Sequence, residues 1–152
     1  LWTGKPFKYT GQHYQIQEVT FQPTPVQTPR IPIWAGGNWP NKPPMRRAAR
    51  LDGYYPIKWE GGMTPDDWRE ALAYIQQHRT LDMPFDAVHG GRVPDDQWHS
   101  AQATIQPYAD AGVTWWIEDA SPWRFGADWE KPWQPIDTER VLELIRRGPP
   151  RL

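Results

Sequence analysis

The chain has 152 residues, no cysteine and a formal net charge of −1, from 17 Lys and Arg against 18 Asp and Glu. This length allows one domain with a core of its own. The balanced charge offers no field to recruit nucleic acid or an anionic membrane, and the lack of cysteine excludes disulfides, cysteine-ligated metals and thiol catalysis.

Tryptophan and proline are unusually frequent, with 11 and 18 residues. The tryptophans indicate either an aromatic core or a stacking surface for ligands, and the prolines indicate many loops. We find no signal peptide and no apolar run long enough to span a bilayer. The composition fits a reducing cytosol, so we expect a cytoplasmic protein. Leu1 stands where a start Met would, which leads us to expect a fragment.

The first 30 residues predict a β-hairpin insertion followed by a proline-rich connector. Residues 7–9 and 14–19 alternate apolar and polar side chains around a turn at 10–12. Three prolines between residues 22 and 30 prevent both a helix and a central strand there. We assign residues 1–30 to this segment and residues 31–152 to a single further domain.

Residues 31–152 predict four strands that alternate with helices. The strands are expected at 31–35, 53–57, 85–89 and 113–118. The helices are expected at 43–51, 65–79, 94–111 (kinked by Pro107) and 138–147, with Thr64 and Asp137 as N-caps. Alternation implies parallel strands with right-handed crossovers, and short apolar strands imply that both sheet faces are covered. Four such strands make half of an eight-stranded barrel or a small open sheet.

The first of these strands ends in Gly36-Gly37 and precedes a helix. Successive backbone N–H groups at such a turn can bind a phosphate, and glycine allows close approach. Gly36, Gly37 and Asn38 are therefore the predicted phosphate loop, the alternative being a plain tight turn. Arg46 on the following helix can add a guanidinium, the alternative being a solvated basic face.

Several ordered motifs resemble the luciferase-like (bacterial luciferase-type) flavin-dependent oxidoreductases. They include Leu1-Trp2-Thr3-Gly4-Lys5-Pro6, Pro32-Ile33-Trp34-x-Gly36-Gly37, Arg46-Arg47-Ala48-Ala49-Arg50-x-Asp52-Gly53, the segment 111–118, and Gly148-Pro149-Pro150-Arg151. The resemblance covers essentially the whole chain. It implies an α/β fold that is the C-terminal half of a (β/α)8 TIM barrel, preceded by the hairpin insertion.

The resemblance also implies a function. Family members bind FMN or the deazaflavin F420 at the carboxyl-terminal mouth of the barrel, and they catalyse monooxygenation or hydride transfer on small molecules. This chain lacks the first four strands, so we expect it to supply the phosphate side of the cofactor site. We expect it to be inactive alone, and to pair with the missing N-terminal half or with a second copy. The sequence does not separate FMN from F420.

Strand ends at the barrel mouth are where such folds place chemistry. They point to Tyr55, Ile57, Lys58, His89, Glu118 and Asp119. His89 is a candidate base, the alternative being a loop histidine in solvent. Glu118 is a candidate partner of the flavin ring, the alternative being a structural ion pair. No metal-binding motif is present, so no metal site is predicted.

Two other interpretations of the chain are open. It can be a non-catalytic aromatic binding module, or a truncated gene product. A module should expose a coplanar row of tryptophans, whereas a barrel should bury Trp34, Trp68 and either Trp115 or Trp116. The tryptophans of the loop after the last strand, Trp123, Trp129 and Trp133, are expected to form a lid or to cover the barrel end.

Overall fold

The computed structural model describes residues 1–128, 130–131, 135 and 137–149, so Trp129, Trp133, Pro150 and Arg151 lie outside the described residues. The chain divides into two compact units, Leu1–Ile33 and Trp34–Leu152. The sequence predicts this division after residue 30, three residues earlier. Each unit is described by itself below.

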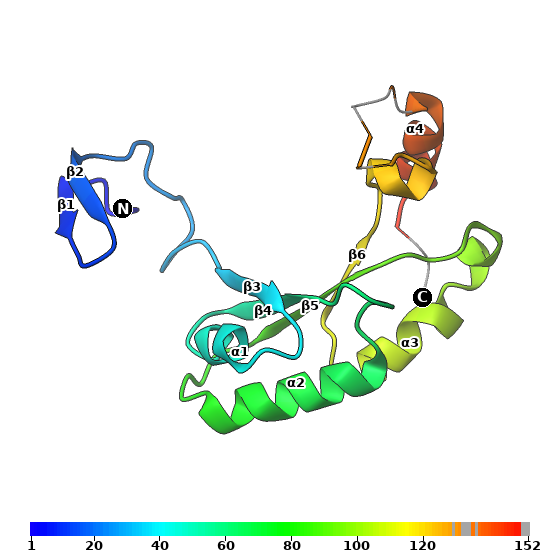
Figure 1. The fold of residues 1–152 in the computed structure, drawn as a ribbon, viewed down its shortest axis with the longest axis horizontal. Helices are drawn as coiled ribbons and strands as arrows, with labels where there is room; N and C mark the ends of the chain where they lie inside the picture. Colours follow the sequence, from blue (N-terminus) through cyan, green and yellow to red (C-terminus); the bar gives the residue numbers. More distant parts are fainter. Residues whose placement is uncertain (129, 132–134, 136, 150–152) are drawn as a thin grey trace. The chain divides into compact units, whose positions relative to one another are not determined.

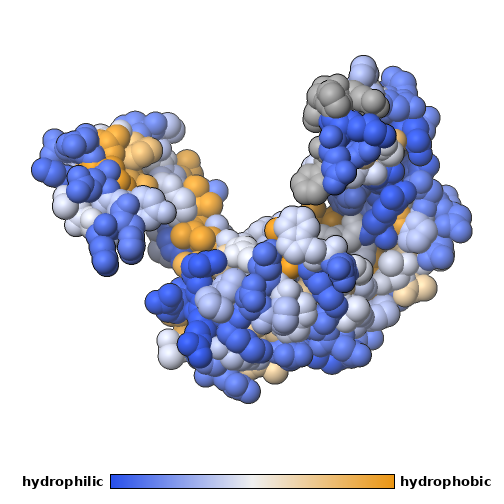
Figure 2. All heavy atoms as spheres, in the orientation of Figure 1, coloured by the Kyte–Doolittle hydropathy of each residue, from blue (hydrophilic) through white to orange (hydrophobic). Residues whose placement is uncertain are grey.

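The first unit contains the predicted β-hairpin. β1 (Phe7–Thr10) pairs antiparallel with β2 (Gln15–Val19), and the Gly11 N–H donates to the Tyr14 carbonyl across the turn at 2.8 Å. None of the residues in this unit is buried, and its hydrophobic residues lie at the surface (orange in Figure 2). An isolated two-stranded hairpin is marginally stable in water, so this unit has little to stabilise it on its own.

The second unit is built on a four-stranded parallel sheet of order β3-β4-β5-β6 (Figure 1). The strands are β3 (Trp34–Asn38), β4 (Gly53–Ile57), β5 (Asp86–Gly91) and β6 (Trp115–Glu118). The helices are α1 (Lys42–Ala48), α2 (Pro65–His78), α3 (Gln102–Asp110) and α4 (Thr138–Arg147), with 3-10 helices η1 (Asp95–Ser100) and η2 (Pro122–Phe125). The predicted parallel α/β arrangement is confirmed, with the strands in sequence order.

The predicted strand at 31–35 is wrong in its bounds. β3 begins at Trp34, after Pro32, which has no N–H to give to a ladder. Gly36 and Gly37 lie inside the strand, in register with Tyr55 and Pro56 of β4, rather than in a turn after it. A Cβ at position 37 would lie 2.4 Å from Pro44 of α1, so Gly37 lets the helix pack against the strand.

The predicted helix at 94–111 is also divided differently. The chain forms η1, turns at Ala101 and continues as α3, with Pro107 inside α3 rather than at the break. The two predicted N-caps are confirmed. The Thr64 hydroxyl accepts from the Asp67 N–H while the Asp67 carboxylate accepts from the Thr64 N–H, and the Asp137 carboxylate accepts from the Arg140 N–H.

Two hydrophobic clusters hold the unit together. The first lies between α1, α2 and the first three strands of the sheet, and its largest buried members are Met45, Tyr54, Trp68 and Ile75. The second joins η1, α3 and α4, and contains Val93, Trp98, Ala101, Ile105 and Leu144. The apolar face predicted for α2 is confirmed, because Trp68, Ala71 and Ile75 are all buried.

The helices cover only one face of the sheet. Side chains alternate along each strand, and the register places Ala35, Tyr54, Ala87 and His89 on the helix-covered face, where all four are buried. The opposite face, which we call the open face, carries the exposed residues Tyr55, Ile57, Trp115 and Ile117, and also Val88, which is fully buried. Trp115 is 51% exposed and Ile57 48%. The prediction that both faces are covered is therefore wrong for the described chain.

One contact spans the open face at the amino ends of the strands. Trp34 and Trp115, on the two edge strands, have ring centroids 5.7 Å apart. Both indole N–H groups donate to the Asp86 carboxylate, at 2.8 and 3.0 Å. A Cβ on Gly53 would lie 2.5 Å from Trp34 and 2.6 Å from the Asp86 carbonyl oxygen. The absence of a side chain at Gly53 makes room for this bridge.

We predict that Gly53→Ala destabilises the second unit by about 1–3 kcal/mol, because the new methyl group collides with backbone as well as with Trp34. Gly36→Ala is the matched control, since its Cβ would meet only the Tyr55 carbonyl oxygen, at an ordinary 3.7 Å. Urea unfolding followed by far-UV circular dichroism measures both. Equal midpoints for the two variants would contradict the role assigned to Gly53.

Candidate functional site at the carboxyl ends of the strands

A pocket of about 510 Å³ lies at the carboxyl ends of β4, β5 and β6. Parallel α/β folds place their ligands at this end of the sheet. Three lining residues, Tyr55, Gly90 and Ile117, belong to the open face. The remaining lining residues follow the strands or end them: Gly91, Arg92, Glu118, Asp119 and Ala120.

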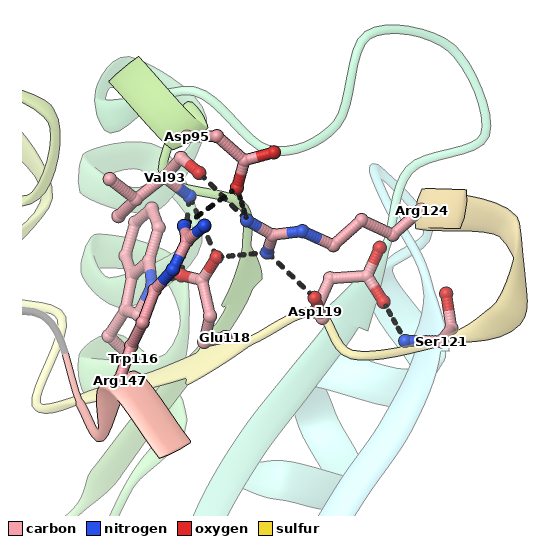
Figure 3. Close-up of polar contacts among 8 residues, drawn as sticks. All are labelled: Val93, Asp95, Trp116, Glu118, Asp119, Ser121, Arg124 and Arg147. Carbon is pink, nitrogen blue, oxygen red and sulfur yellow. Dashed lines mark hydrogen bonds and ion pairs between the residues drawn. The ribbon is translucent and has the colours of Figure 1, made fainter. Parts of the chain in front are cut away.

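Glu118, a predicted candidate, is the centre of a dense set of polar contacts (Figure 3). Its two carboxylate oxygens accept from the Val93 N–H at 3.0 and 3.2 Å, and Oε2 accepts from the Trp116 indole N–H at 2.9 Å. Oε1 also pairs with Nη1 of Arg124. These contacts fit the structural ion pair, which is one of the two alternatives that the sequence leaves open.

Arg124 of η2 completes this set, with a side chain that is only 1% exposed. Besides Glu118, its guanidinium donates to the carbonyl oxygens of Asp119 and Val93, at 2.8 and 3.1 Å. It also donates to the Asp95 carboxylate at 3.0 Å. Arg124 therefore ties the segments that follow β5 and β6 to each other (Figure 3).

The charges in this cluster stabilise one another. Burial of Arg124 opposes its charge, but hydrogen bonds to Glu118 and Asp95 outweigh that effect and raise the pKa of the guanidinium. The hydrogen bond from Arg124 lowers the pKa of Asp95. Arg147 of α4 also reaches Asp95, at 3.4 Å, so the last helix is connected to the same cluster.

We predict that Glu118→Gln destabilises the chain by about 1–3 kcal/mol, because it removes one of the two carboxylates that offset the buried Arg124 charge and leaves Asp95 as the other. Glu143→Gln, on the exposed side of α4, is the control and should change stability by less than about 0.5 kcal/mol. Chemical unfolding measures both. If Glu118→Gln proved as stable as Glu143→Gln, the Arg124 pair would not hold the strand ends.

His89, the other predicted candidate, lies away from the pocket. It is on the helix-covered face and only 6% exposed, so the alternative of a solvent-facing loop histidine is wrong. Its Nδ1 accepts from the Trp68 indole N–H at 3.0 Å, and its ring lies against Tyr108 and Trp116, with centroids 4.2 and 4.9 Å away. Burial lowers its pKa to about 4. These surroundings hold a neutral histidine as part of the core.

We predict that His89 makes stability depend on pH between about 4 and 6.5. The folded chain keeps His89 neutral, whereas the unfolded chain protonates it near the ordinary pKa of 6.5. The unfolded state thus binds more protons in this window, and stability is lost as the pH falls through it, by at most about 3 kcal/mol.

The measurement is urea unfolding at a series of pH values for the wild-type chain and for His89→Gln, which keeps an acceptor near Trp68 and does not titrate. The exposed His99→Gln is the control. We expect the dependence on pH to be shallower for His89→Gln alone. Parallel curves for all three proteins would rule out this role of His89.

The residues of the predicted phosphate loop, Gly36, Gly37 and Asn38, lie within strand β3. The N–H groups of Trp39 and Asn41 already donate to the carbonyls of Ile57 and Asn38, at 2.8 and 3.0 Å. Pro40, Pro43 and Pro44 have no N–H to offer. Gly36 and Gly37 lie in the β3–β4 ladder. Two of the backbone donors that follow the glycines are thus already used, and the packing of α1 against β3 requires a glycine at position 37.

The arginines of α1 have partners within the unit. Arg46, the predicted phosphate partner, donates from Nε to the Tyr74 hydroxyl on α2 at 2.7 Å. Arg47 donates to the Gly36 carbonyl at 3.1 Å. Arg46 therefore does not converge with Gly36, Gly37 and Asn38 on a common ligand position. Its place is the contact between the two helices.

Sequence reasoning missed Arg92 and Arg124. Arg92 follows Gly90-Gly91 directly at the end of β5, which is the same strand-end signal that pointed to Asp119. Arg124 lies in the Trp- and Pro-rich loop, where no periodic pattern marks a buried cation. Tyr55 and Asp119, which the strand-end rule did name, both line the pocket.

No known family profile matches the chain. Part of the chain is similar to uncharacterized proteins of Mycobacterium bovis and of two Mycobacterium tuberculosis strains, at 35% identity over 79 residues. The matched segment is 52% of this chain and spans 25% of the length of each relative. Because these relatives are uncharacterized, the luciferase-like resemblance stays a prediction.

Within the described residues, no helix is long and apolar enough to cross a membrane, and no three side chains of the metal-binding types gather into a cluster.

Proposed function

We propose that this chain is the C-terminal half of a luciferase-like (β/α)8 barrel that uses FMN or F420 to oxidise a small molecule. The observation that carries the proposal is the sheet itself. Its four parallel strands run in sequence order, with helices on one face, an open face on the other and a pocket at the carboxyl ends. This is the arrangement expected of consecutive βα units taken from a barrel.

The size of the relatives supports the proposal. A match of 79 residues that makes up 25% of each relative corresponds to proteins of roughly 320 residues, within the range of complete (β/α)8 barrels. A chain of 152 residues with four parallel strands then supplies about half of such a barrel. The open face and the edge strands β3 and β6 are where the other half, or a second copy of the chain, would complete the sheet.

In this proposal the flavin supplies the hydride or oxygen chemistry. The chain's own contribution is the mouth of the barrel. Tyr55 and Ile117 offer apolar surface, Arg92 and Asp119 offer opposite charges, and the Glu118–Arg124 pair fixes the segments that carry them. The phosphate of the cofactor is not assigned to Gly36, Gly37 and Asn38, because both glycines lie in the β3–β4 ladder and the N–H groups of the following Trp39 and Asn41 already have acceptors.

A non-catalytic aromatic binding module is the second candidate. Such a module would bind its ligand on a coplanar row of exposed tryptophans. Trp115, Trp59 and Trp123 are exposed, but Trp115 packs on Trp34 with the ring planes tilted by 55°. Trp68 is fully buried and Trp98 nearly so. Of the tryptophans that a barrel should bury, Trp68 is buried, Trp34 and Trp116 are only partly buried, and Trp115 is exposed. The described tryptophans therefore meet neither expectation in full.

We predict that the chain binds FMN or F420 weakly, with a dissociation constant in the high micromolar range, because in this proposal the chain supplies only about half of the pocket wall. The measurement is titration of the full chain followed by flavin fluorescence. Ile117→Asp, on the open face and in the pocket lining, should weaken binding, whereas Ile145→Asp, an exposed position on α4, should not. Binding of neither cofactor, or equal binding by both variants, would count against the proposed function.

A further inference from the structure

Two residues at the mouth pocket are lateral neighbours with opposite charge. Gly91 of β5 is in register with Glu118 of β6, and the ladder continues through a hydrogen bond from the Asp119 N–H to the Gly91 carbonyl at 2.8 Å. The next residues along the two strands are Arg92 and Asp119. Because side chains alternate, both follow the open-face residues Gly90 and Ile117, and both line the pocket.

These two charges do not neutralise each other. Arg92 is exposed and makes no hydrogen bond or ion pair within the described part of the chain, although its charge contributes to the lowered pKa of Asp95. Asp119 accepts the Ser121 N–H on Oδ1 at 2.8 Å, and Oδ2 has no hydrogen bond among the described residues. The Arg92 guanidinium and the Asp119 carboxylate therefore lie on neighbouring strand ends, and each can still form a hydrogen bond or ion pair with a ligand.

The other charges in or next to the pocket already have partners. Glu118 lines it, but its oxygens are occupied by Val93, Trp116 and Arg124. Asp95 is held by Arg124 and Arg147. Arg124 is buried and offset by these carboxylates. Among the described residues that line the pocket, the charges still available to a ligand are thus one cation, Arg92, and one anion, Asp119.

The pocket also has an apolar side. The ring of Tyr55 lies over Gly90, where a Cβ would come within 2.7 Å of the phenol oxygen. Ile117 stands on the neighbouring strand and is exposed. A ligand held by the two charges would place its body against these side chains on the open face.

We propose that the mouth pocket binds a zwitterionic ligand with an apolar body, of the α-amino acid type. Its carboxylate pairs with Arg92, its ammonium group with Asp119, and its side chain packs on Tyr55 and Ile117. A simple anion would meet the uncompensated Asp119, and a simple cation would meet Arg92. This inference names the substrate class of the proposed oxidoreductase and rests on that function for the reaction, but not for the binding.

The test uses three matched probes and the full chain. L-phenylalanine carries both charges, 3-phenylpropionate only the carboxylate, and phenethylamine only the ammonium group. Binding is followed by the ¹H–¹⁵N shifts of Gly90, Gly91 and Asp119. We expect phenylalanine to bind at least about threefold more tightly than either single-charge probe, the gain expected from one exposed ionic contact.

Two variants locate the two contacts. Arg92→Gln should remove the advantage of phenylalanine over phenethylamine, and Asp119→Asn should remove its advantage over phenylpropionate. The side-chain amide oxygen introduced by Asp119→Asn can still accept from the Ser121 N–H, so the loop should keep its shape. Arg50→Gln and Asp82→Asn, both exposed and distant in sequence from the pocket, are the controls and should bind as the wild-type chain does.

Several outcomes would overturn the inference: no binding of phenylalanine, equal binding of a single-charge probe, or shifts confined to residues away from the pocket. Parallel titrations with FMN and F420 separate this inference from the proposed function. Cofactor binding without phenylalanine binding would remove only the zwitterion site. Phenylalanine binding that depends on Arg92 and Asp119, without cofactor binding, would leave the site standing and remove the flavin function.

Discussion

The helices of the second unit pack on one face of its parallel sheet, and every feature of the site follows from that asymmetry. Tyr54, Ala87 and His89 alternate into the helix layer and are buried there. Their neighbours Tyr55 and Gly90 alternate to the open face and meet the pocket. A parallel sheet normally has helices on both faces. In the described structure, one face of the sheet has no helix packed against it.

Two sets of polar contacts stabilise this sheet, one at each end of its strands. At the amino ends, Asp86 accepts from Trp34 and Trp115 and bridges the edge strands across the open face. At the carboxyl ends, Glu118 and Arg124 tie together the segments that leave β5 and β6 on the helix side. A buried guanidinium needs several acceptors to offset its desolvation, and Arg124 has four, from Glu118, Asp95 and two carbonyls. The geometry of the site is therefore fixed by polar groups whose hydrogen bonds are already made within the chain.

The sequence predicted the order and type of the elements well, because the hydrophobic period and the helix caps are local signals. Thr64 and Asp137 mark helix starts through their own backbone neighbours. The sequence-based prediction placed β3 too early in the chain. Gly36-Gly37 has the composition of a turn, and Pro32 has no N–H for strand pairing, so the strand begins only at Trp34. A glycine can mark a turn or a close packing contact, and the difference depends on what packs against it. At Gly37 the neighbour is Pro44 of α1, and no local sequence pattern predicts that contact.

The site was predicted less well, for the same reason. The strand-end rule found Tyr55, Glu118 and Asp119, but it could not tell which side of the sheet each side chain takes. His89 and Glu118 end up on the helix side, where their partners are Trp68 and Arg124, and this leaves Arg92 and Asp119 beside the open face. A shift of one residue exchanges the two faces of a strand. Side chains alternate between the two faces of a strand. The position of a residue in this alternation, rather than its type, therefore decides whether a ligand in the pocket can reach it.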